Sequence, residues 1–450
     1  MSSFSPVFPS SPSSAADAAV TPVRHRRRPD WLAAAGVLFA VAWGGNEFTP
    51  LLALYRIHDH MSAQSVNVLL GAYVLGIIPA LLIGGPLSDL RGRRPLMHLA
   101  PALSIAGSVL LTLGAVCHPL LFIGRICSGL ALGLVMAVGS SWIKELSTPP
   151  YSTSGDAGSG ARRATMALTV GFALGAVVAA LLAQFTPIPE IAPYAVNIVL
   201  TAALWLVLIG TPETNPTVTG VPLGKDEDAT SSAPGTSTAA SATPARTPSA
   251  PAHESLRDAL RLREAVSPRF LLVVLPMAPW VFGAAASAYA VLPALVMDLV
   301  PGFEVAFAGI LCFVALSFGV LSQQMARHLI RPHSQRAIAS AMLAVIVGVV
   351  IAAASAFTHS MVITVVAAAA LGFAYGLLLI AGLQETQHCA RPEHLGGMVG
   401  VYYSLTYLGF FIPAILSALA PMITYGAMFL IGGAIAAASV VVIQVGVRRF

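Results

Sequence analysis

Twelve long runs of apolar side chains, separated by polar segments, dominate the pattern along this chain. A helix that crosses about 30 Å of hydrocarbon needs roughly 20 apolar residues, and each run is close to that length. The runs lack the alternation of polar and apolar positions that is typical of membrane barrel strands. The pattern therefore predicts an all-α membrane protein with twelve transmembrane helices. They cover residues 31–54, 66–87, 95–116, 118–142, 164–185, 192–210, 270–296, 304–325, 336–357, 360–383, 395–418 and 422–446.

Two polar segments divide the chain. Residues 1–30 are rich in Ser, Pro and Ala and have no apolar core of a cleavable signal, which predicts a disordered tail. Residues 211–269 form a linker with a low-complexity Ser/Thr/Ala/Pro segment that cannot bury enough apolar surface to fold. Residues 31–210 and 270–450 then form two pseudo-symmetric six-helix halves. In transporters built this way, the substrate site lies near the membrane midplane between the halves.

The basic residues gather on one side of the predicted membrane. With the N-terminus placed in the cytoplasm, 22 of the 24 Lys and Arg residues fall in cytoplasmic segments, as the positive-inside rule requires. The exceptions are Arg56, in the first outer loop, and Arg125, inside the fourth predicted helix. The charges thus predict a multi-pass protein of the cell membrane, with both termini and the linker in the cytoplasm.

The composition agrees with this interpretation. The chain is 56% hydrophobic and only 10% charged, whereas soluble domains carry roughly 25% charged residues. A lipid bilayer must therefore surround most of the chain. The net charge is +5, but the basic residues are dispersed between apolar runs, which argues against a nucleic-acid partner. The four Cys residues show no metal-ligand spacing, and no catalytic motif stands out, so we expect no metal, no cofactor and no enzyme activity.

Four charges crowd into one short loop after the second predicted helix. The stretch "GPLSDLRGRRPL" resembles the signature loop of the major facilitator superfamily, which reads Gly, any, Leu, small, Asp, basic, any, Gly, Arg, basic, any, apolar. Leu90 departs from the pattern, because a basic residue is usual there. The matching positions are Gly85, Leu87, Ser88, Asp89, Gly92, Arg93, Arg94 and Leu96.

Two other stretches bear on the branch of the superfamily. "RICSG", which begins at Arg125, resembles the pattern Arg, two residues, Gln, Gly, with Ser128 in place of Gln. "TPETNP", after the sixth helix, resembles the Pro-Glu-Thr ending of many exporter-like members. These motifs place the chain nearest to the drug/metabolite:proton exporter-like branch. Ala176 stands where drug/proton antiporters usually carry Pro, which weakens export relative to uptake.

The resemblance also implies a conformational latch on the cytoplasmic face. In the family, the motif Asp meets the N-terminal end of helix 11, which lies here near "HLGGMVG", and the motif Arg pairs with an acid at the end of helix 4. These roles fall to Asp89 and Arg93, with Glu145 as the local acid. From their chemistry, Gly85 would let a neighbouring backbone approach closely, and Gly92 would permit a tight turn. Alternatively, the Arg cluster is only a topology signal.

Two charges lie well inside the predicted membrane helices. Glu47, in "WGGNEFTP", and Arg125 both lie roughly 10–12 Å below the outer ends of their helices, at about 1.5 Å per residue. Such residues usually face a cavity and carry function. The resemblance places helices 1 and 4 around the central cavity, so Glu47 could exchange a proton there beside Arg125. The alternative is a permanent structural ion pair. Asn46 and Tyr289 are further candidates for the cavity lining.

We therefore expect a secondary active transporter that rocks its two halves about a central site. The leading hypothesis is proton-coupled export of a small organic compound, by an antiporter. The alternatives are proton-coupled uptake of a nutrient by symport, and a membrane sensor on the same scaffold that transports nothing. The expected partners are a small-molecule substrate, protons and the lipid bilayer, and the expected oligomeric state is a monomer.

Overall fold

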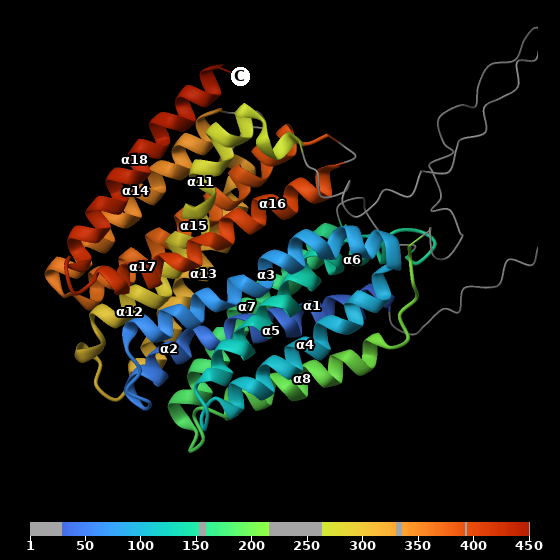
Figure 1. Cartoon of the computed structure of the whole chain (residues 1–450), viewed down its shortest axis with the longest axis horizontal. Coiled ribbons are helices and arrows are strands. Elements are labelled where there is room, and N and C mark those ends of the chain that lie inside the picture. The colour runs from blue at the N-terminus through green and yellow to red at the C-terminus, as the bar shows by residue number, and fades with distance from the viewer. Residues whose placement is uncertain (1–28, 153–158, 216–262, 330–334, 392–393, 450) are drawn as a thin grey trace, which may run out of the picture.

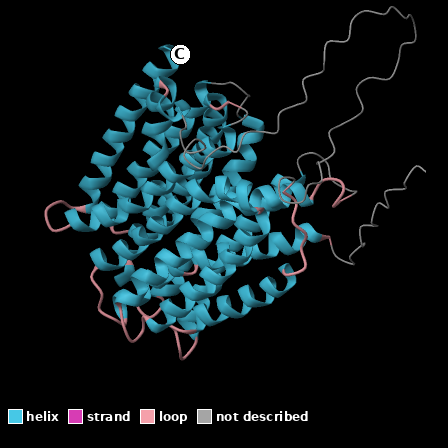
Figure 2. Ribbon diagram, turned by 45° about the vertical axis from the view of Figure 1, so that its right-hand side comes forward, coloured by secondary structure: helices cyan, strands magenta, loops and turns pink. Residues whose placement is uncertain are grey.

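The computed structural model describes residues 29–152, 159–215, 263–329, 335–391 and 394–449, and within these ranges the chain forms helices and loops but no strand (Figure 2). The first half contains α1 (Asp30–Asn46), α2 (Phe48–Ile57), α3 (Ala63–Arg91), α4 (Arg93–Leu113), α5 (Pro119–Leu134), η1 (Val135–Gly139), α6 (Ser140–Leu146), α7 (Ser159–Phe185) and α8 (Ala192–Leu208). The second half contains η2 (Arg263–Val266), η3 (Phe270–Val274), α11 (Leu275–Ala286), η4 (Ser287–Val291), α12 (Leu292–Leu295), η5 (Met297–Leu299), α13 (Glu304–Leu329), α14 (Gln335–Thr358), α15 (Met361–Cys389), α16 (Leu395–Tyr407), η7 (Leu408–Phe411), α17 (Ile412–Leu419) and α18 (Tyr425–Arg449).

The predicted twelve-helix membrane fold is confirmed. Eleven helical segments of the described chain are long and apolar enough to cross a membrane, and α8 is a twelfth, shorter apolar helix. Several spans are built from consecutive elements, such as α1 with α2 and α5 with η1 and α6. Each observed span overlaps one predicted segment, because a run of apolar residues of this length has no other way to satisfy its backbone in lipid.

The two halves lie side by side, with the blue-to-green helices packed against the yellow-to-red ones (Figure 1). The largest contacts between the halves join α7 to α13 and α3 to α16. Small residues allow these close approaches. A Cβ atom at Gly309 on α13, for example, would overlap Ala180 on α7. The central space between the halves is lined by α1, α2, α3, α5 and α7 of the first half and by α11, η4, α13, α15, α16 and η7 of the second.

The first helix of each half is interrupted shortly before a proline. The α1 helix ends at Asn46 and α2 begins at Phe48, two residues before Pro50. In the second half, the π-helical turn η4 comes directly before α12, which contains Pro293. A proline lacks the N–H that would continue the hydrogen-bond ladder, so the preceding turn rearranges. Interrupted helices at corresponding places in two halves mark the substrate region in many transporters.

The linker starts later than the sequence indicated. Residues 211–215 were assigned to it, but Thr211, Thr214 and Asn215 are at most 3% exposed. Asn215 donates to the Ser88 and Asp89 carbonyls near the end of α3, and the Thr214 hydroxyl bonds to the Glu145 carboxylate on α6. The first half therefore extends to Asn215. The predicted disordered tail, apart from Pro29 and Asp30, and the low-complexity segment lie outside the described residues.

Candidate functional site

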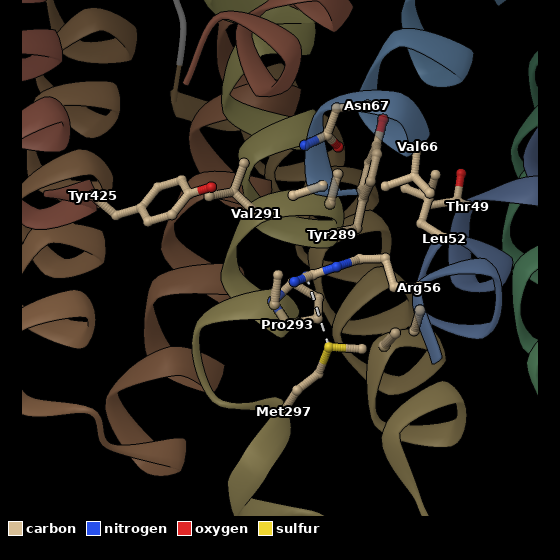
Figure 3. Close-up of a pocket in the computed structure, with 15 residues that line it drawn as sticks. Thr49, Leu52, Arg56, Val66, Asn67, Tyr289, Val291, Pro293, Met297 and Tyr425 are labelled. Carbon is tan, nitrogen blue, oxygen red and sulfur yellow. Dashed lines mark hydrogen bonds between the residues drawn. The ribbon is translucent and has the colours of Figure 1, made fainter. Parts of the chain in front are cut away.

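Three cavities lie along the passage between the halves. We call the end of the bundle that holds the α3–α4 loop the basic face, and the end where α2 stops the opposite face. The opposite-face cavity, drawn in Figure 3, measures about 20 Å³, and the central cavity about 30 Å³. The basic-face cavity is far larger, at about 490 Å³. The molecule is thus nearly closed at its centre and opposite face, and open at its basic face.

Direct contacts between the halves close the opposite face. The Gln184 side chain donates to the Gly302 carbonyl at 2.8 Å and accepts the Ala306 N–H at 3.1 Å. Ser417 bonds to Gln64 at 2.8 Å. These bonds must break if the halves are to separate on this side.

Arg125 lies at the centre with none of its surface exposed. Its guanidinium is stacked over the rings of Phe48 and Tyr73, 4.5 and 4.1 Å from their centroids. Its Nη1 donates one long hydrogen bond, of 3.4 Å, to the Gly45 carbonyl. Among the described residues its Nε has no partner. Arg125 also lines the central cavity, so a cation with donors to spare faces the passage.

Glu47 is equally buried, but it turns away from the cavity. Its Oε1 accepts a hydrogen bond of 3.4 Å from Ser108 on α4, and Asn197 on α8 donates to that same hydroxyl at 2.8 Å. Nearby, the hydroxyls of Tyr55 and Tyr194 bond to each other at 2.7 Å. Glu47 therefore belongs to a polar cluster inside the first half.

The expected pair is brought together only in part. Glu47 and Arg125 interact through their charges, yet no nitrogen–oxygen contact within 4.0 Å joins them in the described structure. Contrary to the expectation, Glu47 is not among the residues that line the central cavity in this conformation, and its carboxylate bonds to Ser108 on α4 instead. The backbone stays helical at Glu47, so Asn46 and Thr49 occupy the side that faces the cavity and Glu47 the side that faces α4.

Asn46 and Tyr289 both line the central cavity, as expected. Asn46 donates from Nδ2 to the Phe172 carbonyl at 2.9 Å and to the Cys312 sulfur, in the other half, at 3.7 Å. Tyr289 also lines the opposite-face cavity, where Figure 3 shows its ring beside Arg56. Both residues therefore lie where the two halves meet.

A cluster of aromatic rings covers the second-half side of the central cavity, and little in the sequence indicated it. The rings of Phe282 and Tyr407 stack with centroids 4.4 Å apart, and Phe410 lies 5.2 Å from Phe282. Tyr375 completes the wall. These residues come from α11, α15, α16 and η7, so only the fold gathers them.

At the basic face, Arg93 contacts Glu145. The guanidinium lies 3.2 Å from that carboxylate and also bonds to Asp89, its neighbour four residues earlier. Asp89 is 65% exposed and lines the basic-face cavity together with Gly396 and Gly397. The two sides of the expected latch thus face one cavity.

Glu213, from the "TPETNP" stretch, is a functional candidate that we missed in the sequence. Its carboxylate accepts the backbone N–H groups of Arg93 at 3.0 Å and Arg94 at 2.8 Å, which begin α4. It also accepts those of Thr214 and Asn215. Burial acts to raise the pKa of Glu213, but these backbone N–H bonds outweigh it and hold the pKa below its ordinary value.

The two motif glycines behave differently. Gly92 has φ of +96°, which confirms the tight turn, and a Cβ there would overlap the Glu213 carboxylate. A Cβ at Gly85 would meet nothing within 4 Å. The expected close approach of a neighbouring backbone to Gly85 is therefore wrong for this structure, because Gly85 lines the open basic-face cavity.

The comparisons with known proteins give the class of the protein. The model of the Major Facilitator Superfamily matches residues 31–414, so the chain belongs to this superfamily. No curated protein matches the sequence. The family and fold indicate a transporter with a small-molecule substrate, embedded in a membrane through many spans, rather than an enzyme. Within the described residues, no group of three or more His, Cys, Asp or Glu side chains is arranged to hold a metal.

Solved transporter structures share the fold. The nucleoside transporter NupG is similar with a TM-score of 0.63 and 14% identity, over 94% of this chain and 99% of that one. The xylose transporter XylE from E. coli gives 0.62 and 14%, over 92% and 96%. A POT family transporter in complex with 5-aminolevulinic acid gives 0.63 and 15%, over 92% and 95%. At this identity the likeness is one of fold alone.

Proposed function

We propose that this protein is a proton-coupled secondary transporter that moves a small organic compound by alternating access. The observation that carries the proposal is Glu47, a carboxyl with no exposed surface beside an interrupted helix and near the cationic Arg125. Ionisable groups at such depth are costly and usually serve transport. The missing direct ion pair favours a group that binds and releases a proton over a permanent structural pair.

Purified protein in liposomes tests the proposal. A pH gradient is imposed, a panel of organic compounds is offered, and proton movement is followed by fluorescence. Glu47→Gln should abolish gradient-driven transport while the protein stays folded. Glutamine has nearly the same shape as glutamate, but its amide cannot bind and release a proton. Glu190→Gln, an acid in the α7–α8 loop, is the matched control and should transport normally.

Each alternative has its own outcome. Full gradient-driven transport by Glu47→Gln would exclude Glu47 as the coupling residue. If the charges only support the fold, Glu47→Gln should destabilise the protein, and the swap of Glu47→Arg with Arg125→Glu should restore both stability and transport. If the protein is a sensor, compounds bind but no proton moves with the wild-type chain.

The direction of transport has two candidates. Export is favoured by the resemblance of the "TPETNP" ending to exporter-like members, and uptake by Ala176 in place of the antiporter proline.

We also propose an orientation in the cell membrane. The basic face and both termini lie in the cytoplasm, and the protein is a monomer. A cysteine introduced at position 235, with the four native Cys removed, should resist membrane-impermeant thiol reagents in intact cells. Rapid labelling of the folded protein would overturn this orientation.

A further inference from the structure

The charges that line the opposite-face and central cavities have one sign. Arg56 lines the opposite-face cavity and Arg125 the central one, and no Asp or Glu is among the described residues that line either. The two cavities share Thr49 and Tyr289. A solute that crosses the centre from the opposite face therefore passes two arginines in succession and no lining carboxylate.

Neither arginine has its charge neutralised by a contact in the described structure. Arg56 reaches from α2 toward the second half, where its Nη1 contacts the Met297 sulfur at 3.8 Å (Figure 3), and a thioether is a weak acceptor. Within the described ranges, Arg125 donates only to the Gly45 carbonyl, and its buried Nε has no partner there. A guanidinium offers five N–H donors in a planar fork that matches a carboxylate.

The second-half wall of the central cavity is aromatic. Phe282 and Tyr407 are stacked 4.4 Å apart, and Phe410 lies 5.7 Å from Tyr407 with its ring 20° from parallel. Rings of this kind take up another planar ring by offset stacking or edge contact. The first half therefore supplies the cations, and the second half supplies most of the aromatic rings that line the central cavity.

From these observations we propose that the passage binds an aromatic monoanion, an arylcarboxylate, with its carboxylate on Arg125 and its ring against Phe282, Tyr407 and Phe410. Arg56 attracts the anion at the opposite face. The central cavity, at about 30 Å³, is closed down in this conformation, so the ring enters as the halves move. This site specifies the substrate class of the proposed transporter, and it rests on that proposed function for the coupling of anion and proton movement.

A bound anion also affects whether the proton moves with the substrate or against it. Arg125 is the cation near Glu47, and the other groups around that carboxyl are the Ser108, Tyr55 and Tyr194 hydroxyls and the Asn197 amide. A bound anion and an ionised Glu47 compete for the same guanidinium. The anion is therefore bound together with a proton rather than in exchange for one, which is symport.

Three probes of nearly the same shape and different charge test the site. The full-length protein is placed in lipid nanodiscs at pH 7.5, and saturable binding of radiolabelled 2-naphthoate is measured. Unlabelled 2-naphthoate should compete at a concentration at least about tenfold lower than 2-naphthamide or 2-naphthylmethylamine. Acetate, which has the charge without the ring, should compete weakly. Equal competition by the amide or the amine, or no saturable binding to the folded protein, overturns the proposal.

Single substitutions test anion binding independently of folding and of transport. Arg125→Lys, which loses the planar fork, should weaken 2-naphthoate binding at least about tenfold. Arg56→Gln, at a half-buried position, should weaken it about threefold or more with the fold intact. Arg163→Gln is the matched control, because Arg163 stacks on Trp31 at 4.0 Å and lines none of the three cavities. Unchanged binding by both Arg125→Lys and Arg56→Gln would overturn the site.

The two proposals fail in different ways. Glu47→Gln should bind 2-naphthoate at least as tightly as the wild type, because Glu47 does not line the cavity and glutamine no longer competes for the Arg125 charge. If wild-type protein binds 2-naphthoate but moves no protons with it in liposomes, the site stands and proton-coupled transport fails. If it moves protons with a neutral compound and binds no 2-naphthoate, proton-coupled transport stands and the anion site fails.

Discussion

The two halves share an arrangement of helices but differ in what they bury. The first half encloses two charges, Glu47 and Arg125, with a network of Ser, Thr and Asn side chains around them. Among the described residues of the second half, no Asp, Glu, Lys or Arg is buried, and the face toward the passage is made of aromatic rings. The two halves thus have similar backbones, but their buried side chains differ in charge and polarity.

This difference suggests how the movement of one half controls the access of water to the buried charges of the other. A buried charge is costly wherever it lies, so both charges are held inside one half, where hydroxyls and amides surround them. The rings of the other half line the same central cavity as Arg125, and Phe410 lies 6.3 Å from Tyr73, on whose ring Arg125 stacks. We expect the motion of the ring-bearing half to set how much water reaches the charged half.

The halves also differ at the basic face. In the first half, Glu213 gathers four backbone N–H groups, and Arg93 bonds to Glu145. In the second half, the corresponding connections are between side chains. Arg269 bonds to Glu385 at 2.6 Å, and Glu264 accepts from His394 at 3.0 Å. Backbone-anchored carboxylates hold a loop in place more firmly than exposed pairs do.

The largest expected effect comes from removing the Glu213 charge. Glu213→Gln should lower the free energy of unfolding by about 1–2 kcal/mol, because hydrogen bonds to a charged acceptor are lost. Glu385→Gln, the matched change in the second half, removes a single side-chain pair whose Arg269 partner is 39% exposed, and it should cost about 0–1 kcal/mol. Thermal unfolding of the purified proteins measures both. Equal losses would contradict the contrast between the halves.

The same variant has a defined pH dependence. Because the native pKa of Glu213 is lowered, its contribution to stability is present above the unfolded value of about 4.3 and is lost as the pH falls through the native value. The stability difference between wild type and Glu213→Gln should therefore vanish in acid.

Glu190 should show the opposite pH dependence. Burial raises the pKa of Glu190, so Glu190→Gln should gain stability relative to wild type as the pH rises.

The next effect concerns Asp89. Its carboxylate faces the same cavity as the start of α16, so when the halves close there it can stabilise that helix N-terminus by about 0.3–2 kcal/mol. Asp89→Asn should slow transport in liposomes by up to roughly thirtyfold, with membrane insertion and expression unchanged. Normal transport rates would remove the latch. Glu304→Gln, at the opposite face, is the matched control and should transport normally.

The sequence predicted the spans well because their length and apolar character leave few alternatives. It also singled out Glu47 and Arg125, which are buried in the structure, and through a resemblance it paired Arg93 with Glu145. It missed the direction of Glu47, because almost the whole surface of this helix is buried and only its packing against distant helices decides which side meets the cavity.

Other features depend on distant parts of the chain. Glu213 meets Arg93 and Arg94 across about 120 positions, and nothing in the local pattern of "TPETNP" indicates that contact. The aromatic wall is likewise gathered from four elements. Gly85 was misjudged because the packing around it depends on the conformation, and in this one the cavity beside it is open.

The smallest expected effect tests whether the second half works through its rings or through its hydroxyls. Tyr407 contacts the Met136 sulfur of the first half through its hydroxyl at 3.2 Å, between the central and basic-face cavities. Tyr407→Phe removes only this weak bond, so transport should change less than about threefold, under 1 kcal/mol. Tyr407→Ala also removes the stack on Phe282 and should reduce transport far more. A large loss in Tyr407→Phe, measured as initial rates in liposomes, would show that the second half contributes hydrogen bonding as well as ring surface, and the proposed division between the halves would fail.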